Sequence, residues 1–394
     1  MSSAPDRLTI LHVSEVHWGG VITLLDHFTR QQVAAGHQVH VLAPEPVGDA
    51  LADGVDFHRW AVRRGRPHGY PRAVSQLRRL VAELRPDVIH LHSFFAGLLG
   101  RLPGALGPEP PPVVYQPHAW SDHLFRQEPL NALVRRLERR GARRTDVLVT
   151  NCRDEIDRGA GFGVRLPSFP LGVTVDGDRF RPPTAEERAA ARAELGLNDE
   201  RMLLVLGRLA WQKGQDLLLP VWERRHPEGA VLALVGPGET EELAPLAPTQ
   251  WGHSVRAPGG VADVLPWLWA SDLLVLSSRY ETVGLVVAEA MATGLPVVAT
   301  EVDGVREVVE DPPGDAAGAV VGAEDVEALL DAAVTRLNDP ALVEGERAAA
   351  LSRARTLFAP PVVAARLEEA YRAARDLRAH PHSTAQPTTT EENP

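Results

Sequence analysis

The chain has 394 residues, and at roughly 150 residues per domain this length predicts at least two domains. Its 44% hydrophobic and 24% charged residues are ordinary for a globular protein, while a net charge of −11 argues against nucleic-acid binding. The only cysteine is Cys152, which excludes an intrachain disulfide and a cysteine-ligated metal site. No uncharged stretch is long enough to span a bilayer and no leader is recognisable, so we expect a cytoplasmic protein.

Short apolar runs alternate with helical patterns through the first half of the chain. The run 8–13 leads through the turn Trp18-Gly19-Gly20 into a helical pattern over 21–35, which Gly36 ends. Further strands are expected at 38–43, 87–91, 113–116 and 147–150, and further helices at 71–84 and 131–143. Strands that alternate with helices predict a doubly wound parallel sheet.

The same pattern begins again after the Pro-rich joint Arg181-Pro182-Pro183. A strand at 202–206, a polar turn at 207–214 and a helix at 215–222 open this half. Strands follow at 231–235, 273–276 and 296–300, and a long helix follows at 361–378. We therefore expect an α/β protein with two facing Rossmann-like, doubly wound parallel sheets that share a cleft beyond the carboxyl ends of their strands.

These patterns define the expected domains. They are an N-terminal Rossmann-like domain over 1–180, a C-terminal Rossmann-like domain over 181–360, a terminal helix over 361–379 that packs on the first domain, and a disordered polar tail over 380–394. Neither half contains G-x-G-x-x-G, and no Walker lysine motif is present, which disfavours a nicotinamide, flavin or P-loop enzyme.

Two glutamates eight residues apart, Glu281 and Glu289, belong to the most informative block of the sequence. The run 272–276 before them reads as a strand, and 284–293 reads as a helix that Gly294 and Pro296 end. Glu281 then lies in the strand–helix loop and Glu289 on the helix. The backbone N–H groups expected at the helix start, where an anion is favoured, are those of Val283, Gly284 and Leu285.

The second block is the turn over 207–214, which contains Arg208 and Lys213. Forty of the 41 basic residues are arginine, and Lys213 is the single lysine. Two cations beside a glycine turn at the end of a strand can neutralise a diphosphate without a metal ion. The alternative is a charged turn that is only solvated, but the occurrence of a single lysine favours a functional role for this turn.

Together, these blocks resemble the E-x7-E signature and the Gly-Arg…Lys-Gly turn of retaining glycosyltransferases of family 4, which have the GT-B fold. The early Gly19-Gly20 turn is also similar, and the resemblance covers nearly the whole chain. It implies that Arg208 and Lys213 hold the nucleotide diphosphate, that Glu289 bonds the ribose hydroxyls and that Glu281 faces the hydroxyls of the donor sugar. It also implies that 1–180 is the acceptor-side domain and 181–360 the nucleotide-sugar-binding domain, so that Gly19 and Gly20 would lie against the phosphates from the other domain.

Two histidines end predicted strands. His118 resembles the cleft histidine of the family, which lies near the reacting sugar, with a half-buried structural histidine as the alternative. For His92 the structural interpretation is preferred, because His90 and His92 alternate as strand residues do.

Three features depart from the family or mimic other sites. Thr282 stands where the family usually has glycine, and the segment Leu171-Gly172-Val173-Thr174 replaces its usual N-G-V-D segment. The sequence therefore does not determine which sugar the donor carries. Asp176 and Asp178 have D-x-D spacing, but they precede the joint and read as loop residues.

The resulting expectation is a retaining, metal-independent hexosyltransferase without a cofactor, which uses an NDP-sugar donor and a hydroxyl acceptor. The alternatives are an NDP-sugar epimerase or phosphorylase on the same fold, and a sugar-nucleotide-binding protein without turnover.

The segment Leu130–Arg144 also suggests peripheral contact with the inner membrane face. Its leucines and valine form one helical face and its arginines crowd the rest. The apolar residues are Leu130, Leu133, Val134 and Leu137, and the basic residues are Arg135, Arg136, Arg139, Arg140, Arg143 and Arg144. A core-packed helix with a solvated basic face is the alternative.

Overall fold

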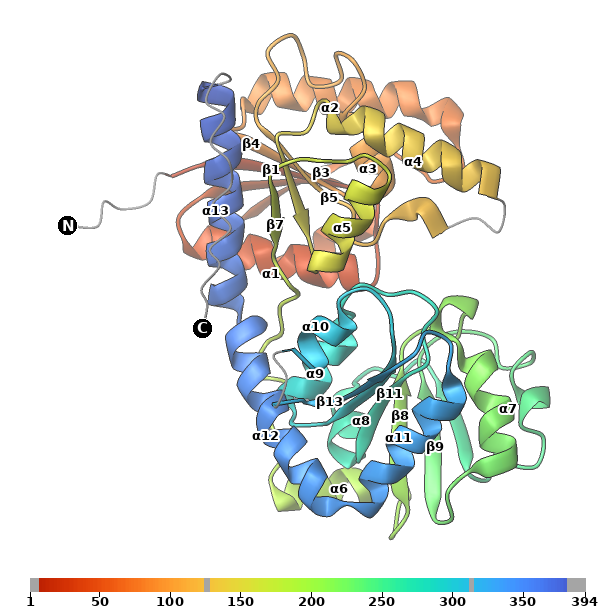
Figure 1. Ribbon diagram of the computed structural model, residues 1–394. Coiled ribbons are helices and arrows are strands. Elements are labelled where there is room, and N and C mark those ends of the chain that lie inside the picture. Colours follow the sequence, from red (N-terminus) through yellow and green to blue (C-terminus); the bar gives the residue numbers. More distant parts are fainter. Residues whose placement is uncertain (1–6, 124–127, 312–314, 381–394) are drawn as a thin grey trace. The chain divides into compact units, whose positions relative to one another are not determined.

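The computed structural model describes residues 7–123, 128–311 and 315–380 (Figure 1). The chain forms two compact units, Met1–Leu171 with Val363–Pro394, and Gly172–Val362. The first unit thus ends before residue 180, because the segment after Leu171 already packs in the second unit, where the Val175 amide donates to the Phe358 carbonyl at 3.0 Å. All but the first residue of the predicted disordered tail, 380–394, lies outside the described residues.

The first unit is built on a seven-stranded parallel sheet with the order β3-β2-β1-β4-β5-β6-β7. Its strands are β1 (Thr9–Ser14), β2 (Gln38–Ala43), β3 (Val55–Arg59), β4 (Val88–His92), β5 (Val113–Gln116), β6 (Val147–Thr150) and β7 (Ser168–Pro170). The sheet is covered by helices α1 (Gly20–Ala34), α2 (Tyr70–Leu84), α3 (Ser93–Gly100), α4 (Glu128–Ala142), α5 (Arg153–Gly161) and α13 (Pro360–Ala379) (Figure 1).

Helix α13, at the end of the chain, packs on this first sheet. The Tyr371 hydroxyl bonds His90 at 2.9 Å, and the Arg378 guanidinium donates to Asp146 at 3.0 Å. Tyr371 is fully buried, so the helix contributes to the core of the first unit.

The second unit has a six-stranded parallel sheet with the order β10-β9-β8-β11-β12-β13. Its strands are β8 (Arg201–Leu206), β9 (Ala230–Val235), β10 (Val255–Gly259), β11 (Leu273–Leu276), β12 (Val297–Thr300) and β13 (Gly318–Val321). Its helices are α6 (Ala185–Glu194), α7 (Gln215–Arg225), α8 (Leu265–Ala270), α9 (Leu285–Ala292), α10 (Val305–Val309), α11 (Val326–Asn338) and α12 (Pro340–Leu357).

The prediction of two doubly wound parallel sheets is confirmed. In both sheets the strand order reverses between two central neighbours, β1 and β4 in the first and β8 and β11 in the second. Ligands of such sheets bind where the order reverses, beyond the carboxyl ends of the strands. Among the described residues, no helix is both long enough and apolar enough to span a membrane.

Candidate functional site

The turn after β8 lies directly against the end of β11. Gly214 adopts a positive φ of 67°, and a Cβ there would lie 1.9 Å from the Ser277 carbonyl oxygen, so only glycine fits. The Ser277 hydroxyl donates to the Lys213 carbonyl at 2.9 Å. This close approach brings the turn that contains Arg208 and Lys213 beside the loop that contains Glu281.

Within this pair of loops, the Lys213 ammonium forms an ion pair with the Glu281 carboxylate, and each side chain is only 15% exposed. Arg208 donates to the Gln212 side chain at 3.1 Å, and Gln212 in turn donates to the Tyr280 carbonyl at 3.2 Å. The two cations and the first glutamate of the motif therefore form one cluster at the β8–β11 switch point.

Helix α9 begins beside this cluster. Gly284 is its N-cap residue, and a Cβ on Gly284 would lie 3.5 Å from the Glu281 carboxyl carbon. The Val283 N–H already donates to the Asp303 carbonyl at 3.2 Å, so Val283 is not available as the anion donor we expected. For Gly284 and Leu285 the role of anion donor stays a prediction, which is consistent with the first N–H groups of a helix having no partner within it.

Glu289 lies on α9 and its side chain is half-buried. Burial raises the pKa of this carboxyl to about 7, and the charge of Arg179 only partly offsets the effect. A ligand that donates hydrogen bonds to Glu289 would favour its ionised form.

The D-x-D spacing near the interdomain joint forms a turn. The Asp176 carboxylate accepts hydrogen bonds from the N–H groups of Asp178 and Arg179, which agrees with the prediction that these are loop residues.

The first unit carries its own candidate site at the β1–β4 switch point. Gly19, the N-cap of α1, has a φ of 78° and a ψ of −166°, a conformation open essentially to glycine alone. Gly20 is the first residue of the helix, so the glycine turn lies at a helix start, and anion binding there stays a prediction.

His118 follows β5 in a strained loop. His118 and Ala119 both have positive φ values, 55° and 102°, which non-glycine residues adopt at a cost. The buried carboxylate of Glu155 holds this loop, since it accepts the Ala119 N–H at 2.9 Å and the Asn151 N–H at 2.7 Å. The sequence carries no signal that connects Glu155 with His118.

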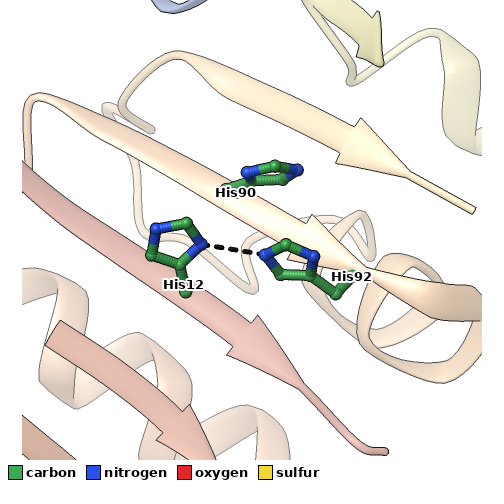
Figure 2. A group of neighbouring side chains, drawn as sticks. All are labelled: His12, His90 and His92. Atoms are coloured by element: carbon green, nitrogen blue, oxygen red, sulfur yellow. Dashed lines mark hydrogen bonds between the residues drawn. The ribbon is translucent and has the colours of Figure 1, made fainter. Parts of the chain in front are cut away.

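Three buried histidines form a cluster, His12 of β1 with His90 and His92 of β4 (Figure 2). His12 Nδ1 and His92 Nε2 are 2.8 Å apart, and His92 Nδ1 lies 2.9 Å from His118 Nε2. His92 is therefore a strand residue, as preferred from its spacing, but it also contacts the candidate site.

The three clustered histidines are close enough to consider a metal ion, but their geometry favours hydrogen bonding. The His90 and His92 rings stack with centroids 4.0 Å apart and an interplanar angle of 28°, so their in-plane lone pairs do not converge. The 2.8 Å between His12 and His92 is a hydrogen-bond distance, which requires a proton between the two nitrogens.

This cluster makes the first unit sensitive to acid. Burial lowers the pKa of His12 to about 4 and that of His118 to about 3, and it lowers those of His90 and His92 well below 6.5. The unfolded chain thus binds more protons than the folded one below pH 6.5, so stability falls as the pH decreases from 6.5 toward 4. We expect a loss of about 2 kcal/mol from His12 alone, measured by urea unfolding between pH 7 and 4.5.

The control for this prediction is His68→Gln, which removes an exposed histidine outside the cluster. His12→Gln should make the pH dependence shallower, whereas His68→Gln should leave it unchanged. An equal slope in the parent and the His12 variant would contradict the assignment.

Comparisons with known proteins match both halves of the chain to glycosyltransferases. Residues 18–175 match the model described as Glycosyltransferase Family 4, and residues 200–339 match the model described as Glycosyl transferases group 1. Glycogen synthase of Mycobacterium tuberculosis is 30% identical, with 91% of this chain and 92% of the relative aligned. The lipopolysaccharide core mannosyltransferase LpsB of Rhizobium meliloti is 31% identical, but the match covers 49% of this chain and 57% of LpsB.

Solved structures share the fold at lower identity. Sucrose-phosphate synthase of Thermosynechococcus elongatus superposes with a TM-score of 0.80 at 21% identity, over 93% of this chain and 98% of that one. HepE of Anabaena, solved in complex with UDP-glucose, has a TM-score of 0.77 at 20% identity, over 92% and 99% of the two chains.

Proposed function

Because the chain belongs to glycosyltransferase family 4, has the GT-B fold and transfers a sugar from a nucleotide-sugar donor, we propose that it does so with retention of anomeric configuration and without a metal ion. The observation that supports this proposal is the cluster of Arg208, Lys213 and the α9 helix start at the β8–β11 switch point. It supplies positive charge and N–H donors for a leaving diphosphate from the chain itself.

The chemistry follows from where charge develops. As the bond between the sugar and the diphosphate breaks, negative charge accumulates on the phosphate oxygens, and fixed cations and N–H groups stabilise it. Lys213 would exchange its contact with Glu281 for the phosphate. That exchange frees the Glu281 carboxylate to accept hydroxyls of the donor sugar, while Glu289 accepts those of the ribose.

No step requires Glu281 as a nucleophile. Family resemblance favours attack of the acceptor hydroxyl on the same face from which the diphosphate leaves.

The donor is tested with UDP-glucose and GDP-mannose. HepE is solved with the first, and a mannosyltransferase of Mycolicibacterium smegmatis, 37% identical over 46% of this chain, is named as dependent on the second. NDP release that requires a hydroxyl acceptor identifies transfer. An isomerised donor without acceptor indicates an epimerase, and binding without NDP release indicates a binding protein.

Metal independence gives the next prediction. Transfer should survive an excess of EDTA with at most a modest loss of rate, because Arg208 and Lys213 supply the charge that Mg²⁺ supplies in metal-dependent enzymes. A complete loss that only Mg²⁺ or Mn²⁺ restores would contradict this proposal.

We also propose that α4 contacts an anionic surface, such as a membrane or a lipid-linked acceptor. Val134 packs in the core, but Leu130 and Leu133 are 39% and 51% exposed, on the side of the helix where Arg136 and Arg140 are also exposed. A pocket of about 500 Å³ beside Arg136, lined by α4 and by residues 160–165 at the end of α5, adds further positive charge. Its basic lining residues are Arg135, Arg136, Arg139 and Arg165.

Co-sedimentation with vesicles tests this contact. The protein should bind vesicles that contain phosphatidylglycerol at low salt, bind less at high salt and bind little to neutral phosphatidylcholine. The variant Arg136→Glu/Arg140→Glu should abolish binding. Arg78→Glu/Arg79→Glu, the same charge change on exposed residues of α2, should leave most of it. Equal loss in both variants, or no binding at either salt concentration, would rule out a specific role for α4.

A further inference from the structure

The buried histidines form a linear chain that ends at the candidate site. Gln32 of α1 bonds His12 at 2.8 Å, His12 bonds His92 at 2.8 Å, and His92 bonds His118 at 2.9 Å. Gln32, His12 and His92 are each at most 3% exposed. Residues from α1, β1, β4 and the loop after β5 thus contribute one hydrogen-bonded series.

The amide of Gln32 gives this series a direction. Its nitrogen donates to the Tyr371 hydroxyl at 3.2 Å, so its oxygen faces His12 and can only accept. His12 must then carry its proton on Nε2 and accept on Nδ1. By the same reasoning, His92 donates from Nε2 and accepts on Nδ1, which requires His118 to donate from Nε2.

The far end of the series has no partner within the described part of the chain. His118 Nδ1 is buried and makes no hydrogen bond there. With the proton on Nε2, this nitrogen carries a lone pair. Burial also lowers the pKa values of His12, His92 and His118, so all three rings are neutral near pH 7.

We propose that Gln32, His12 and His92 are positioning residues that hold His118 in its Nε2–H tautomer, so that His118 Nδ1 accepts a hydrogen bond from a hydroxyl of a sugar that binds the first unit at the β1–β4 switch point. This inference rests on the proposed function for the identity of the hydroxyl donor. It also gives the site a specificity rule: a sugar with a hydroxyl at this position is accepted, and one with an acceptor-only group there is disfavoured, because two lone pairs would face each other.

The tautomer can be measured without any substrate. In protein labelled with ¹⁵N-histidine, the His118 signals, identified by their loss in His118→Gln, should show a protonated Nε2 and an unprotonated Nδ1 at pH 7. Gln32→Met, which removes the anchor but keeps the volume, should shift His118 toward a mixture of tautomers. Gln32→Glu, which restores an acceptor oxygen, should return the parent pattern.

Kinetics provide the second readout. Gln32→Met should lower kcat/KM about 3- to 10-fold, as expected for one neutral hydrogen bond, and Gln32→Glu should recover to within about twofold of the parent. Tyr371→Phe is a milder change that removes the partner of the Gln32 amide, and it should also lower kcat/KM. It replaces Gln32→Met in the experiment if that variant does not fold. The matched control is Thr29→Val, which alters another buried polar side chain of α1 outside the series.

A His118 protonated on Nδ1 in the parent, or a tautomer unaffected by both Gln32→Met and Tyr371→Phe, would overturn the proposal. A parent that shows the expected tautomer but transfers no sugar would instead contradict the proposed function alone.

Discussion

Replacing Lys213 by alanine is expected to lower kcat/KM for sugar transfer by roughly 10- to 150-fold, the cost of a hydrogen bond to a charged partner. Lys213 is the single lysine among 41 basic residues, so a compact ammonium is retained where arginine serves elsewhere. The structure gives a reason for this preference. A Cβ on Gly207 would lie 3.2 Å from the Lys213 Cε, so the lysine stem passes close to the backbone, where a planar guanidinium has less room. The kcat/KM of Lys213→Arg should therefore lie between that of the parent and that of Lys213→Ala.

The ion pair with Glu281 makes a single variant ambiguous, because Lys213→Ala also leaves Glu281 without its partner. A double-mutant cycle with Glu281→Gln separates the two effects. If Lys213 binds the diphosphate directly, its removal should still lower kcat/KM severalfold in the Glu281→Gln background. If it acts only by holding Glu281, the second loss should vanish.

The control for this cycle is Arg225→Ala, which removes an exposed cation that is ion-paired with Glu327 and Asp331 away from the cluster. It should leave kcat/KM unchanged. A folded Lys213→Ala variant within about twofold of the parent would show that Lys213 is not a ligand of the diphosphate.

The central strands could be predicted from the sequence because they are buried on both faces. β8, β9 and β11 read as continuous apolar runs, and their predicted ranges agree with the structure to within a residue or two. The edge strands β3 and β10 could not be predicted from the sequence, because both are partly exposed to solvent and lack a continuous apolar run. β3 contains Asp56, His58 and Arg59, and β10 contains Pro258.

The loops at the switch point could be predicted in part. Glycine turns and paired glutamates give local signals, so Arg208, Lys213 and Glu281 were expected at the ends of strands. Their contact depends on β8 and β11 being neighbours, which the doubly wound pattern implies. The bond from Val283 to Asp303 was not predictable, because Asp303 follows a different strand.

The histidine series illustrates what local patterns miss. Gln32, His12, His92 and Tyr371 are far apart in sequence, and their contacts arise from the pairing of β1 with β4 and from the return of α13. The spacing of His90 and His92 indicated only a strand. The register that pairs His12 with His90 would have been needed to predict a cluster.

Glu289 is expected to show a conflict between stability and function. Its raised pKa of about 7 means that the folded state binds more protons than the unfolded state between about pH 4.5 and pH 7. Stability therefore falls as the pH rises through this window and stays lower above it. Glu289→Gln, which is neutral at every pH, should match the parent near pH 5 and be more stable at pH 8, by about 1–3 kcal/mol or a few degrees in Tm.

The same substitution should weaken binding of the nucleotide-sugar donor. An ionised Glu289 accepts two ribose hydroxyls more strongly than an amide does, so kcat/KM should fall about 10- to 100-fold at pH 8. Binding of the intact NDP-sugar, whose diphosphate diester does not titrate near neutral pH, should strengthen in the parent as the pH rises through 7. In Glu289→Gln it should be nearly independent of pH. Calorimetric titrations at pH 6, 7 and 8 measure this difference, and parallel pH profiles for the two proteins would show that Glu289 does not contact the donor.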